Sequence, residues 1–409
     1  MKIVFLAPFG IRPKGTVIAR MLPLAAELQA LEHEVVIVAP PYTNPEDSGK
    51  TEVVRGVRLV NVDLGPKHKA LAAPFLACRM FRAALKEKPD LIHLFKPKGY
   101  GGITAMLLMS LQHLGVRTPP LFLDTDDWEG EGGMNELHDY SSTEKRFYRF
   151  QEQWLTRRAL GVTVASRGLE HLVRQMGVMQ DHLLYLPNCV ATAPAGDGQA
   201  VRTRLGIAPD APVLLLYTRF FEFGQEKLHF LFSGVFKQVA GIRFLVVGKG
   251  RHGEEELLLQ AARKSGFDAA LVIAGWVAPE TIPDYLAAAD VAVYPFADTL
   301  VNRTKCPAKL TEILLAGTAV VADRVGQLSE YIDDGHSGVL CDPDDWRQMV
   351  DRTVELLKSP ALQQKVGAAG RVYLQKNFNW RDAANSLDLF YQSRMQSIPR
   401  ISAHSQGRL

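Results

Sequence analysis

Residues 289–345 read ADVAVYPFADTLVNRTKCPAKLTEILLAGTAVVADRVGQLSEYIDDGHSGVLCDPDD. Short apolar runs alternate there with longer amphipathic segments, which is the pattern of buried parallel strands joined by helices. Pro307 suits a first helical turn and Gly317 the position just beyond a helix end, so the pattern predicts one helix over 308–316. Lys309 and Glu312 then share one face of this helix, either as an ordinary surface pair or as part of an anion site.

The same alternation extends through the whole chain. We expect strands at 3–7, 34–39, 57–62, 91–94, 121–125 and 161–165, and then at 213–217, 244–248, 271–274, 291–294, 319–322 and 339–340. Between the two sets, residues 186–200 read LPNCVATAPAGDGQA, which is poor in large apolar side chains, as linkers are. The pattern predicts an α/β protein with two Rossmann-like domains, 1–188 and 189–376, and a mobile tail over 397–409.

Composition excludes several classes of protein. The chain has 409 residues, 47% of them hydrophobic and 22% charged, so it is a globular protein and not a disordered one. A net charge of +3 is too small to indicate a nucleic-acid partner. The N-terminal run MKIVFLAP is typical of a buried strand and not of a signal peptide, and no apolar stretch approaches the roughly 20 residues of a spanning helix. We therefore expect a cytoplasmic protein with reduced, scattered thiols at Cys78, Cys189, Cys306 and Cys341.

Several linked motifs resemble the family-4 retaining glycosyltransferases (glycosyl transferases group 1), which have the GT-B fold. They are ADVAVYPF, KLTEILLAGTAVVA, VGQLSEYI and DGHSGVL in the stretch above, and RFLVVGKGRHGEEELLLQAA and LVIAGWVAPETIPDYLAAAD before it. LPNCV at 186–190 is similar to the family's interdomain PNGV turn, and LEHEVVIV and PDLIHLF match in the first half. NFNWRDAANSLDLFYQS at 377–393 resembles the terminal helix that crosses back to the first domain, here expected over 377–396.

The resemblance implies two parallel sheets facing across a cleft, with an acceptor-binding first domain and a donor-binding second domain. The implied enzyme is a hexosyltransferase that moves a sugar from a nucleotide-diphosphate-sugar to a carbohydrate or lipid-linked acceptor. The resemblance implies a reaction with retention, with closure of the two domains and without a metal. It also implies a role in glycan, glycolipid or cell-surface polysaccharide synthesis. No cofactor is implied, because the nucleotide-sugar is a substrate.

The resemblance assigns the donor site residue by residue. Glu312 matches the glutamate that binds the donor ribose, and a carboxylate is suited to accept two hydroxyl donors. Lys309 and Arg219 would face the diphosphate and stabilise its charge as it departs. The other donor contacts are expected at Gly248, Gly250, Trp276, Val277, Thr304, Lys305, Cys306, Pro307 and Lys227.

The sequence departs from the family pattern in two places. Thr304 stands where the family has its first glutamate, so the contact that this glutamate makes to the donor sugar is lost or supplied otherwise. The lysine expected five positions after Arg219 is replaced by Gly224, and the nearest lysine is Lys227.

In the first domain, residues 121–136 read LFLDTDDWEGEGGMNE. Acidic side chains there follow a buried strand and precede a glycine-rich loop that can approach a ligand closely. Where the family often has a histidine, this chain has Asp126 or Asp127, which we expect to orient the acceptor hydroxyl or the sugar. A helix cap and a metal site are the alternatives. Further cleft residues are expected at Gly15, Lys96, Lys98 and Trp128.

Residues 65–89, GPKHKALAAPFLACRMFRAALKEKP, place basic side chains around an apolar face. Such a helix either touches an anionic membrane or is a crossover helix with a solvated basic edge, and we favour the second interpretation.

Three other functions remain open. GKGRHG at 248–253 is a GxGxxG that suggests an NAD-dependent oxidoreductase, but the next strand ends in AGW and lacks the acid that binds a ribose. A nucleotide-sugar-binding pseudo-enzyme would explain Thr304. An epimerase of the same fold fits KLTEILLAG less well.

Overall fold

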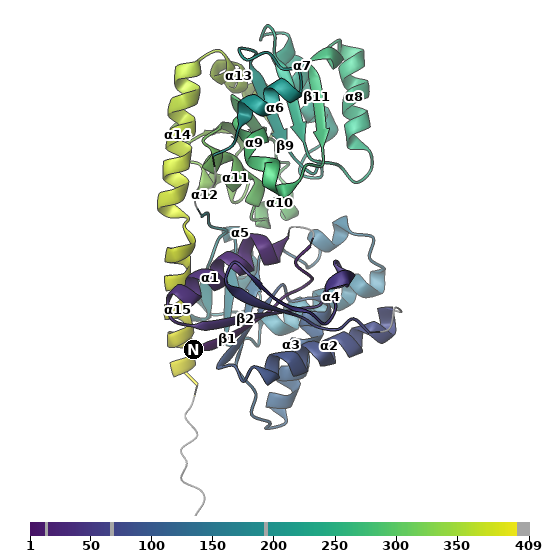
Figure 1. Cartoon of the computed structure of the whole chain (residues 1–409), viewed down its shortest axis with the longest axis vertical. Coiled ribbons are helices and arrows are strands. Elements are labelled where there is room, and N and C mark those ends of the chain that lie inside the picture. The colour runs from purple at the N-terminus through teal and green to yellow at the C-terminus, as the bar shows by residue number, and fades with distance from the viewer. Residues whose placement is uncertain (13–14, 66–68, 192–194, 399–409) are drawn as a thin grey trace, which may run out of the picture. The chain divides into compact units, whose positions relative to one another are not determined.

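The computed structural model describes residues 1–12, 15–65, 69–191 and 195–398 (Figure 1). The chain divides into two compact units, each built on a parallel sheet with helices on both faces. Unit 1 holds Met1–Ala165, Leu169–Pro187 and the chain from Trp380, and unit 2 holds Ser166–Gly168 and Asn188–Asn379. The predicted α/β class with two Rossmann-like folds is confirmed.

Unit 1 has an eight-stranded sheet in the order β3-β4-β2-β1-β5-β6-β7-β8. All neighbours pair in parallel except β3 and β4, which form an antiparallel hairpin. The strands are β1 (Lys2–Leu6), β2 (Glu34–Ala39), β3 (Thr51–Val54), β4 (Val57–Asn61), β5 (Leu91–Phe95), β6 (Leu121–Thr125), β7 (Gly161–Val164) and β8 (Leu183–Tyr185).

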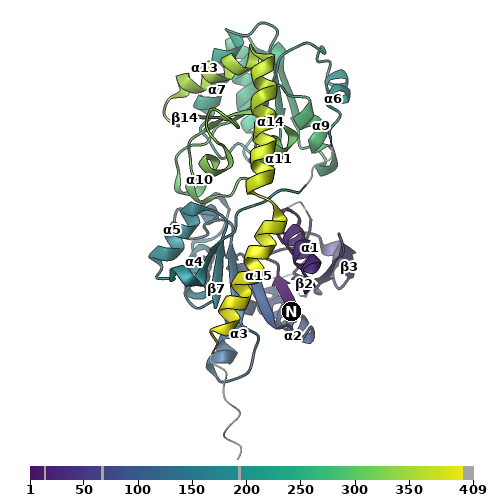
Figure 2. The same ribbon diagram turned by 90° about the vertical axis from the view of Figure 1, so that its left-hand side faces the viewer.

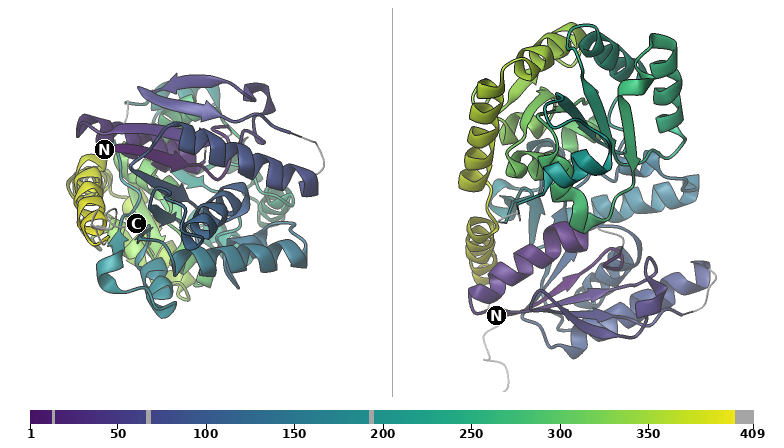
Figure 3. Two further views of the ribbon diagram at one scale, coloured as in Figure 1. Left: turned by 90° about the horizontal axis from the view of Figure 1, so that it is seen from below. Right: turned by 45° about the horizontal axis from the view of Figure 1, so that its top comes forward.

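Right-handed crossovers place the helices of unit 1 on two faces. α1 (Leu22–Ala30) continues a π-helical turn, η1 (Val17–Met21), and packs against α15 (Trp380–Gln396), as Figure 2 shows. On the other face α2 (Lys69–Lys86) and α3 (Gly99–His113) lie side by side (Figure 3). The remaining helical segments are α4 (Ser142–Thr156), α5 (Arg167–Gln175), η2 (Pro45–Asp47), η3 (Met134–Leu137) and η4 (Gln180–His182).

The terminal helix α15 is fixed to unit 1 by buried polar contacts. The Tyr391 hydroxyl lies 2.6 Å from Nδ1 of His93, and Nε of Arg394 donates to the carbonyl oxygen of Leu160 at 3.0 Å. Burial, with the nearby Arg20 guanidinium, lowers the pKa of His93 to about 3, so this histidine is neutral. The contact is therefore structural. Of the predicted mobile tail, residues 399–409 lie outside the described part of the chain.

Unit 2 has a six-stranded parallel sheet in the order β11-β10-β9-β12-β13-β14. The strands are β9 (Val213–Tyr217), β10 (Arg243–Val247), β11 (Leu271–Gly275), β12 (Val291–Tyr294), β13 (Ala319–Asp323) and β14 (Val339–Cys341). One face carries α7 (Gln225–Phe236), α8 (Glu254–Ser265) and α13 (Trp346–Leu357), and the other α9 (Ile282–Ala287), α11 (Ala308–Ala316) and α14 (Pro360–Asn377). The shorter segments are α6 (Gly198–Arg204), η5 (Asp268–Ala270), η6 (Pro279–Thr281), α10 (Leu300–Thr304) and α12 (Leu328–Tyr331).

In each sheet the strand order reverses at one place, between β1 and β5 in unit 1 and between β9 and β12 in unit 2. Ligands of doubly wound sheets bind outside the carboxyl ends of the strands at such a point. β12 pairs with β9 only at Val291↔Leu214 and Ala292↔Leu215. The two strands therefore diverge before their carboxyl ends and leave room between the loops that follow.

Two strands were missed in the sequence. β8 is only three residues long, and β3 is joined to β4 through Arg55 and Gly56, which both have positive φ, at 51° and 81°. Two central residues with positive φ are typical of a tight hairpin turn, but arginine at the first position gives no sequence signal for it. Within the described residues, no helix has both the length and the apolar character required to cross a membrane.

Candidate functional site

The carboxyl ends of β9 and β12 in unit 2 border a small hollow. Its lining residues are Leu216, Tyr217, Thr218, Glu222, Phe223, Val293, Tyr294, Pro295 and Phe296. The buried Glu222 carboxylate accepts from the Thr218 hydroxyl at 3.3 Å and from the Lys305 ammonium at 2.7 Å. Burial raises the pKa of Glu222, but Lys305 and Lys309 lower it by more. The net shift is downward, so the carboxylate is charged.

Lys309 lies in the first turn of α11, with its ammonium 4.4 Å from the centroid of the Tyr217 ring. Its pKa is lowered to about 7, first by burial and then by the positive charges of Arg219 and Lys305, although Glu222 and Glu312 oppose the shift. Cations therefore gather at a helix N-terminus, where the helix dipole is itself positive. Such an arrangement is suited to bind an anion with more than one negative charge.

Glu312 lies one turn further along α11 and is hydrogen-bonded to the Tyr217 hydroxyl. Burial and this carboxylate raise the pKa of Tyr217, so the tyrosine keeps its proton and acts as the donor. The ring of Tyr217 therefore contacts Lys309 while its hydroxyl orients Glu312. Arg219, two residues beyond Tyr217, is exposed at the same loop.

The loop after β10 comes very close to the loop after β9. Gly248 has φ +118°, and a Cβ there would lie 1.9 Å from the Thr218 carbonyl oxygen, so only glycine fits. A Cβ at Gly250 would lie 2.1 Å from Oε2 of Glu254. At the end of β11 the Trp276 side chain is 61% exposed, and Val277 beside it is partly buried.

The structure gives Lys227 a role other than the predicted one. Its ammonium lies 2.7 Å from both carboxylate oxygens of the buried Asp323 and 2.9 Å from the carbonyl oxygen of Pro343. These contacts use its three N–H donors. Lys227 therefore joins α7 to the end of β13 and has no donor left for a diphosphate.

Of the residues just before α11, Thr304, Cys306 and Pro307 are buried and Lys305 is partly exposed. The Thr304 hydroxyl donates to the carbonyl oxygen of Leu300 at 2.8 Å, so it closes its own helical turn and does not replace the family's first glutamate. Cys306 is buried with Sγ 3.1 Å from the Tyr331 hydroxyl. Pro307 is the N-cap of α11 and not its first helical residue. Lys305 alone of these directs its side chain into the hollow, at Glu222.

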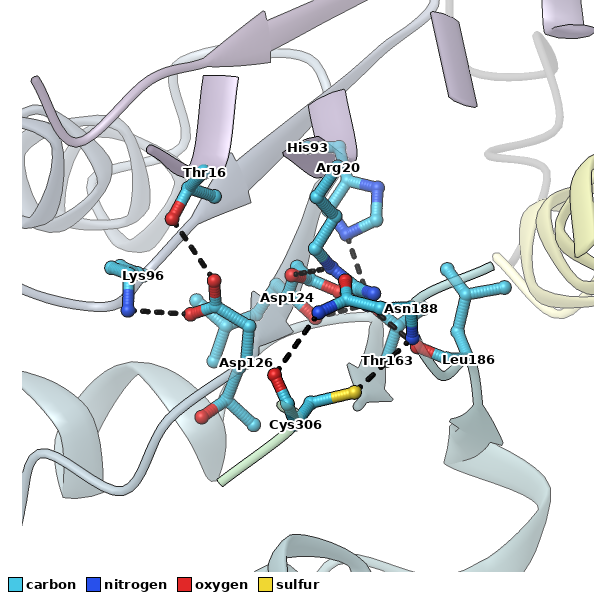
Figure 4. A network of polar contacts seen from close by, with 12 residues as sticks. Thr16, Arg20, His93, Lys96, Asp124, Asp126, Thr163, Leu186, Asn188 and Cys306 are labelled. Carbon is cyan, nitrogen blue, oxygen red and sulfur yellow. Dashed lines mark hydrogen bonds and ion pairs between the residues drawn. The ribbon is translucent and has the colours of Figure 1, made fainter. Parts of the chain in front are cut away.

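A second polar site lies at the carboxyl ends of β5 and β6 in unit 1 (Figure 4). The Lys96 ammonium lies 2.7 Å from Oδ1 of Asp126 and 2.6 Å from Oδ2 of Asp127, and the Thr16 hydroxyl donates to Oδ2 of Asp126 at 3.0 Å. Lys96 is buried with φ +59°, a strained backbone for a lysine. Strain of this kind persists where the surroundings hold it, and here two carboxylates hold the ammonium.

The pKa values of the two aspartates are shifted in opposite directions. Burial raises the pKa of Asp126, but Lys96 and Arg20 lower it more, so the net shift is downward. The pKa of Asp127 is raised by burial and by the charges of Asp126 and Glu129, despite Lys96. Asp126 therefore stays ionised and can accept a hydrogen bond from a hydroxyl.

Asp124, the first acid of the 121–136 segment, has a structural role. Its carboxylate accepts hydrogen bonds from Nε of Arg20 at 2.8 Å and from a second guanidinium nitrogen at 2.6 Å, and it also accepts from the Thr163 hydroxyl. Asp124, Arg20 and Thr163 are all buried. The same guanidinium also donates to the carbonyl oxygen of Leu186 at 2.7 Å. Figure 4 shows this pair beside the Lys96–Asp126 contact. Arg20 thus ties η1 to β6 and places Asp126 at the strand end.

The remaining predicted cleft residues have separate roles. Trp128 is buried, its Nε1 donates to the Glu131 carbonyl oxygen at 3.0 Å, and a Cβ at Gly130 would lie 2.2 Å from its ring. Trp128 therefore shapes its own loop and does not project from it. Gly15 precedes η1, accepting from the amide of Ala19 at 2.9 Å. Lys98 pairs with Glu129 at 2.7 Å.

Comparison with known proteins gives the family. Residues 15–189 match the model of the glycosyl transferase 4-like domain, and residues 211–359 match the model of the glycosyl transferases group 1. The chain belongs to the group 1 glycosyltransferases. The predicted family and enzyme class are confirmed, and the comparisons give no support to an oxidoreductase or to a binding protein without activity.

Similar proteins include transferases of several pathways. Glycogen synthase of Mycobacterium tuberculosis is 23% identical over 405 residues, 92% of each chain. The lipopolysaccharide 1,2-N-acetylglucosaminetransferase of Salmonella typhimurium is 31% identical over 166 residues, which are 37% of this chain and 41% of that protein. Among solved structures, sucrose-phosphate synthase from Thermosynechococcus elongatus has a TM-score of 0.73 at 18% identity, covering 96% of this chain and 98% of that one. This likeness confirms the predicted GT-B fold.

Sequence reasoning missed three residues of the transferase that organise its candidate sites. Glu222 holds Lys305, Tyr217 links Lys309 to Glu312, and Thr16 donates to Asp126. Their positions carried a signal, since each ends or follows a strand that borders a reversal of strand order. No three histidine, cysteine or acidic side chains of the described residues gather as metal ligands would.

Proposed function

We propose that unit 2 of this glycosyltransferase binds a nucleotide-diphosphate-sugar and that unit 1 orients the hydroxyl of a carbohydrate acceptor. The observation that carries the proposal is the convergence of Arg219 and Lys305 on Lys309, close enough that both lower its pKa. Glu222 and Glu312 oppose the repulsion between these cations, and a further anion would reduce it more. A diphosphate supplies that anion at the N-terminus of α11.

The neighbouring groups then bind the other parts of the donor. Glu312, held by Tyr217, accepts hydrogen bonds from the ribose hydroxyls. Gly248 lets the loop after β10 approach the loop after β9, and Trp276 and Val277 contact the base. A structure of HepE from Anabaena with UDP and glucose, at 18% identity and a TM-score of 0.72 over 96% of this chain and all of that one, has the same fold.

For the chemical step, we propose transfer with retention and without a metal. Arg219, Lys309 and the positive end of α11 stabilise the charge that develops on the departing diphosphate. Asp126, kept ionised by Lys96, accepts a hydrogen bond from the acceptor hydroxyl and directs its oxygen to the anomeric carbon. Proton NMR of the anomeric centre of the product tests the stereochemistry, and activity lost in a chelator contradicts the metal-free mechanism.

The donor site is tested by binding. Thermal unfolding with UDP, GDP, ADP or dTDP identifies the nucleotide, because a ligand of the folded state raises its stability. Calorimetry then compares Arg219→Ala with Arg263→Ala, an exposed arginine at the end of α8. Losing a hydrogen bond to a charged group weakens binding by roughly tenfold to a hundredfold for Arg219→Ala. Equal affinities in the two variants contradict the assignment.

The sequence favours a solvated crossover helix for α2, but with its exposed aromatic in view we also propose that the transferase acts in the cytoplasm with peripheral contact to anionic membrane through α2. Phe75 on this helix is 40% exposed, and the Arg79 guanidinium lies 4.1 Å from its ring centroid. An exposed aromatic beside a cation is suited to a lipid interface. Co-sedimentation with phosphatidylglycerol vesicles tests this contact: Phe75→Ala should reduce it, and equal binding to phosphatidylcholine vesicles contradicts it.

A further inference from the structure

Unit 1 gathers four tyrosines near the Lys96–Asp126 contact. We call them the tyrosine cluster, and its members are Tyr42, Tyr100, Tyr140 and Tyr148. Tyr42 packs edge-on against Tyr100 with ring centroids 5.4 Å apart, and Tyr140 against Tyr148 at 5.1 Å. Tyr100 and Tyr148 lie on α3 and α4, which pack together and are joined by the Gly99 amide donating to Oε1 of Gln151 at 2.9 Å, so the two pairs are neighbours. Residues far apart in the sequence thus form one aromatic surface.

This surface is continuous with the carboxylates of unit 1. The Lys98 ammonium lies 5.6 Å from the Tyr140 centroid and 5.9 Å from that of Tyr148, and it pairs with Glu129 at 2.7 Å. Glu129 in turn lies 3.7 Å from the Lys96 ammonium. A chain of contacts therefore leads from the tyrosine cluster to Asp126.

The cluster is open to a ligand. The Tyr42 side chain is 44% exposed, and the other three tyrosines are partly exposed. Among the described residues, the hydroxyls of Tyr42, Tyr100 and Tyr148 find no hydrogen-bond partner. A buried core tyrosine usually finds one. These rings therefore offer apolar faces together with hydroxyls that a polar ligand can use.

The chemistry favours one kind of ligand. An acyl chain would cover the tyrosine hydroxyls without giving them hydrogen-bond partners, which is unfavourable. A phosphate or a uronic acid would meet Asp126, Asp127 and Glu129, whose three carboxylates outnumber the two ammonium groups of Lys96 and Lys98. A neutral saccharide has apolar C–H faces for the rings and hydroxyls for the polar groups.

We propose that the tyrosine cluster is a subsite for a neutral sugar unit of the acceptor, next to the unit whose hydroxyl Asp126 orients. This inference rests on the proposed function and makes it more specific: the acceptor is a neutral oligosaccharide, free or carried on a larger molecule, and not a single sugar. The ring of the second sugar stacks on the cluster, and Glu129 and Lys98 lie where the two sugars join.

A glycan array probed with the labelled full chain tests the proposal, using neutral and acidic glycans from mono- to hexasaccharides. Wild type should bind neutral oligosaccharides better than the corresponding monosaccharides. Tyr148→Ala and the loop variant Tyr42→Ala should each weaken this binding by roughly tenfold, as expected for the loss of one stacking contact. Phe150→Ala, which removes a 49% exposed ring from the same helix α4, should leave it unchanged.

The same preparations are titrated with the nucleoside diphosphate, which binds unit 2. Nucleotide binding retained in Tyr148→Ala and Tyr42→Ala, with glycan binding lost, supports the subsite. Two outcomes overturn the subsite and leave the proposed function standing, provided that nucleotide still binds. In the first, wild type binds no neutral glycan; in the second, Tyr148→Ala and Phe150→Ala bind glycan equally. A wild-type chain that binds no nucleotide contradicts the proposed function itself.

Discussion

The ammonium of Lys309 lies 4.4 Å from the centroid of the Tyr217 ring. This contact joins two elements that are far apart in the sequence, the end of β9 and the first turn of α11. Because the Tyr217 hydroxyl also bonds to Glu312, one side chain fixes both the cation proposed for the diphosphate and the carboxylate proposed for the ribose.

Tyr217→Phe keeps the ring under Lys309 and removes the hydrogen bond to Glu312. The loss of one such bond costs about 1 kcal/mol, so nucleoside diphosphate affinity should fall roughly fivefold. Calorimetry measures the change, and Tyr285→Phe, a buried tyrosine beside Arg204 in the same unit, is the control. The role of Tyr217 is wrong if both variants bind as the wild type does.

Binding of the diphosphate should depend on pH through Lys309. Its pKa of about 7 in the folded protein is lower than the usual value, so the ammonium loses its proton as pH rises through neutrality. A bound anion favours the protonated form, and affinity should therefore fall by up to about tenfold per pH unit above pH 7. Calorimetry in buffers of different ionisation enthalpy should show proton uptake on binding, which Lys309→Arg should abolish. Proton uptake unchanged in that variant contradicts the assignment.

The lowered pKa also has a consequence for stability. Between about pH 7 and the usual lysine range, the unfolded chain binds a proton that the folded chain does not, so Lys309 makes stability without ligand rise with pH over that range. Lys309→Met removes the group that titrates. Urea unfolding at pH 7 and pH 9 should therefore show a smaller rise for Lys309→Met than for the wild type, and an equal rise indicates an unperturbed lysine.

Lys96→Asn should destabilise unit 1, because it leaves the partly buried Asp126 and Asp127 and the buried Glu129 without their shared cation. Breaking a buried ion pair costs about 3–5 kcal/mol, which urea unfolding measures. Asparagine tolerates the left-handed backbone, so strain does not confuse the result. Lys88→Asn is a matched control, since Lys88 has φ +50° and is exposed. Equal losses in the two variants would mean that the ion pairs contribute nothing.

Lys227→Met distinguishes a structural role of Lys227 in unit 2 from a role in nucleotide binding. It leaves the Asp323 carboxylate without its ammonium partner, and stability should fall by about 3 kcal/mol. Nucleotide affinity of the folded variant should stay unchanged, because the three donors of Lys227 are used within the protein. A large loss of affinity at full folding would return Lys227 to the donor site.

Much of the fold was readable from the sequence because local patterns decide it. The alternation of apolar runs and amphipathic segments places the parallel strands, and Gly317, with φ +80°, ends α11 at Ala316 as predicted. The hairpin of β3 and β4 was not readable, since Arg55 gives no turn signal. Local patterns thus predict an element when its turn uses a typical turn residue, such as glycine, and miss it when the turn does not.

The candidate sites were readable only in part. Arg219 and Asp126, after strand ends, and Lys309, at a helix start, were predicted from position and family resemblance, and these assignments stay proposals. What a side chain is paired with depends on the neighbouring strand, so the burial of Lys227 against Asp323 had no local signal. The contact of Lys96 with Asp126 likewise arises only because β5 and β6 are neighbours in the sheet.

The most direct test of the proposed donor site is a crystal structure of the chain with the nucleoside diphosphate that stabilises it most. We expect the diphosphate within hydrogen-bonding distance of Arg219 and Lys309, and a ribose hydroxyl on the carboxylate of Glu312. A nucleotide bound elsewhere in unit 2, with these three side chains free of it, would contradict the account.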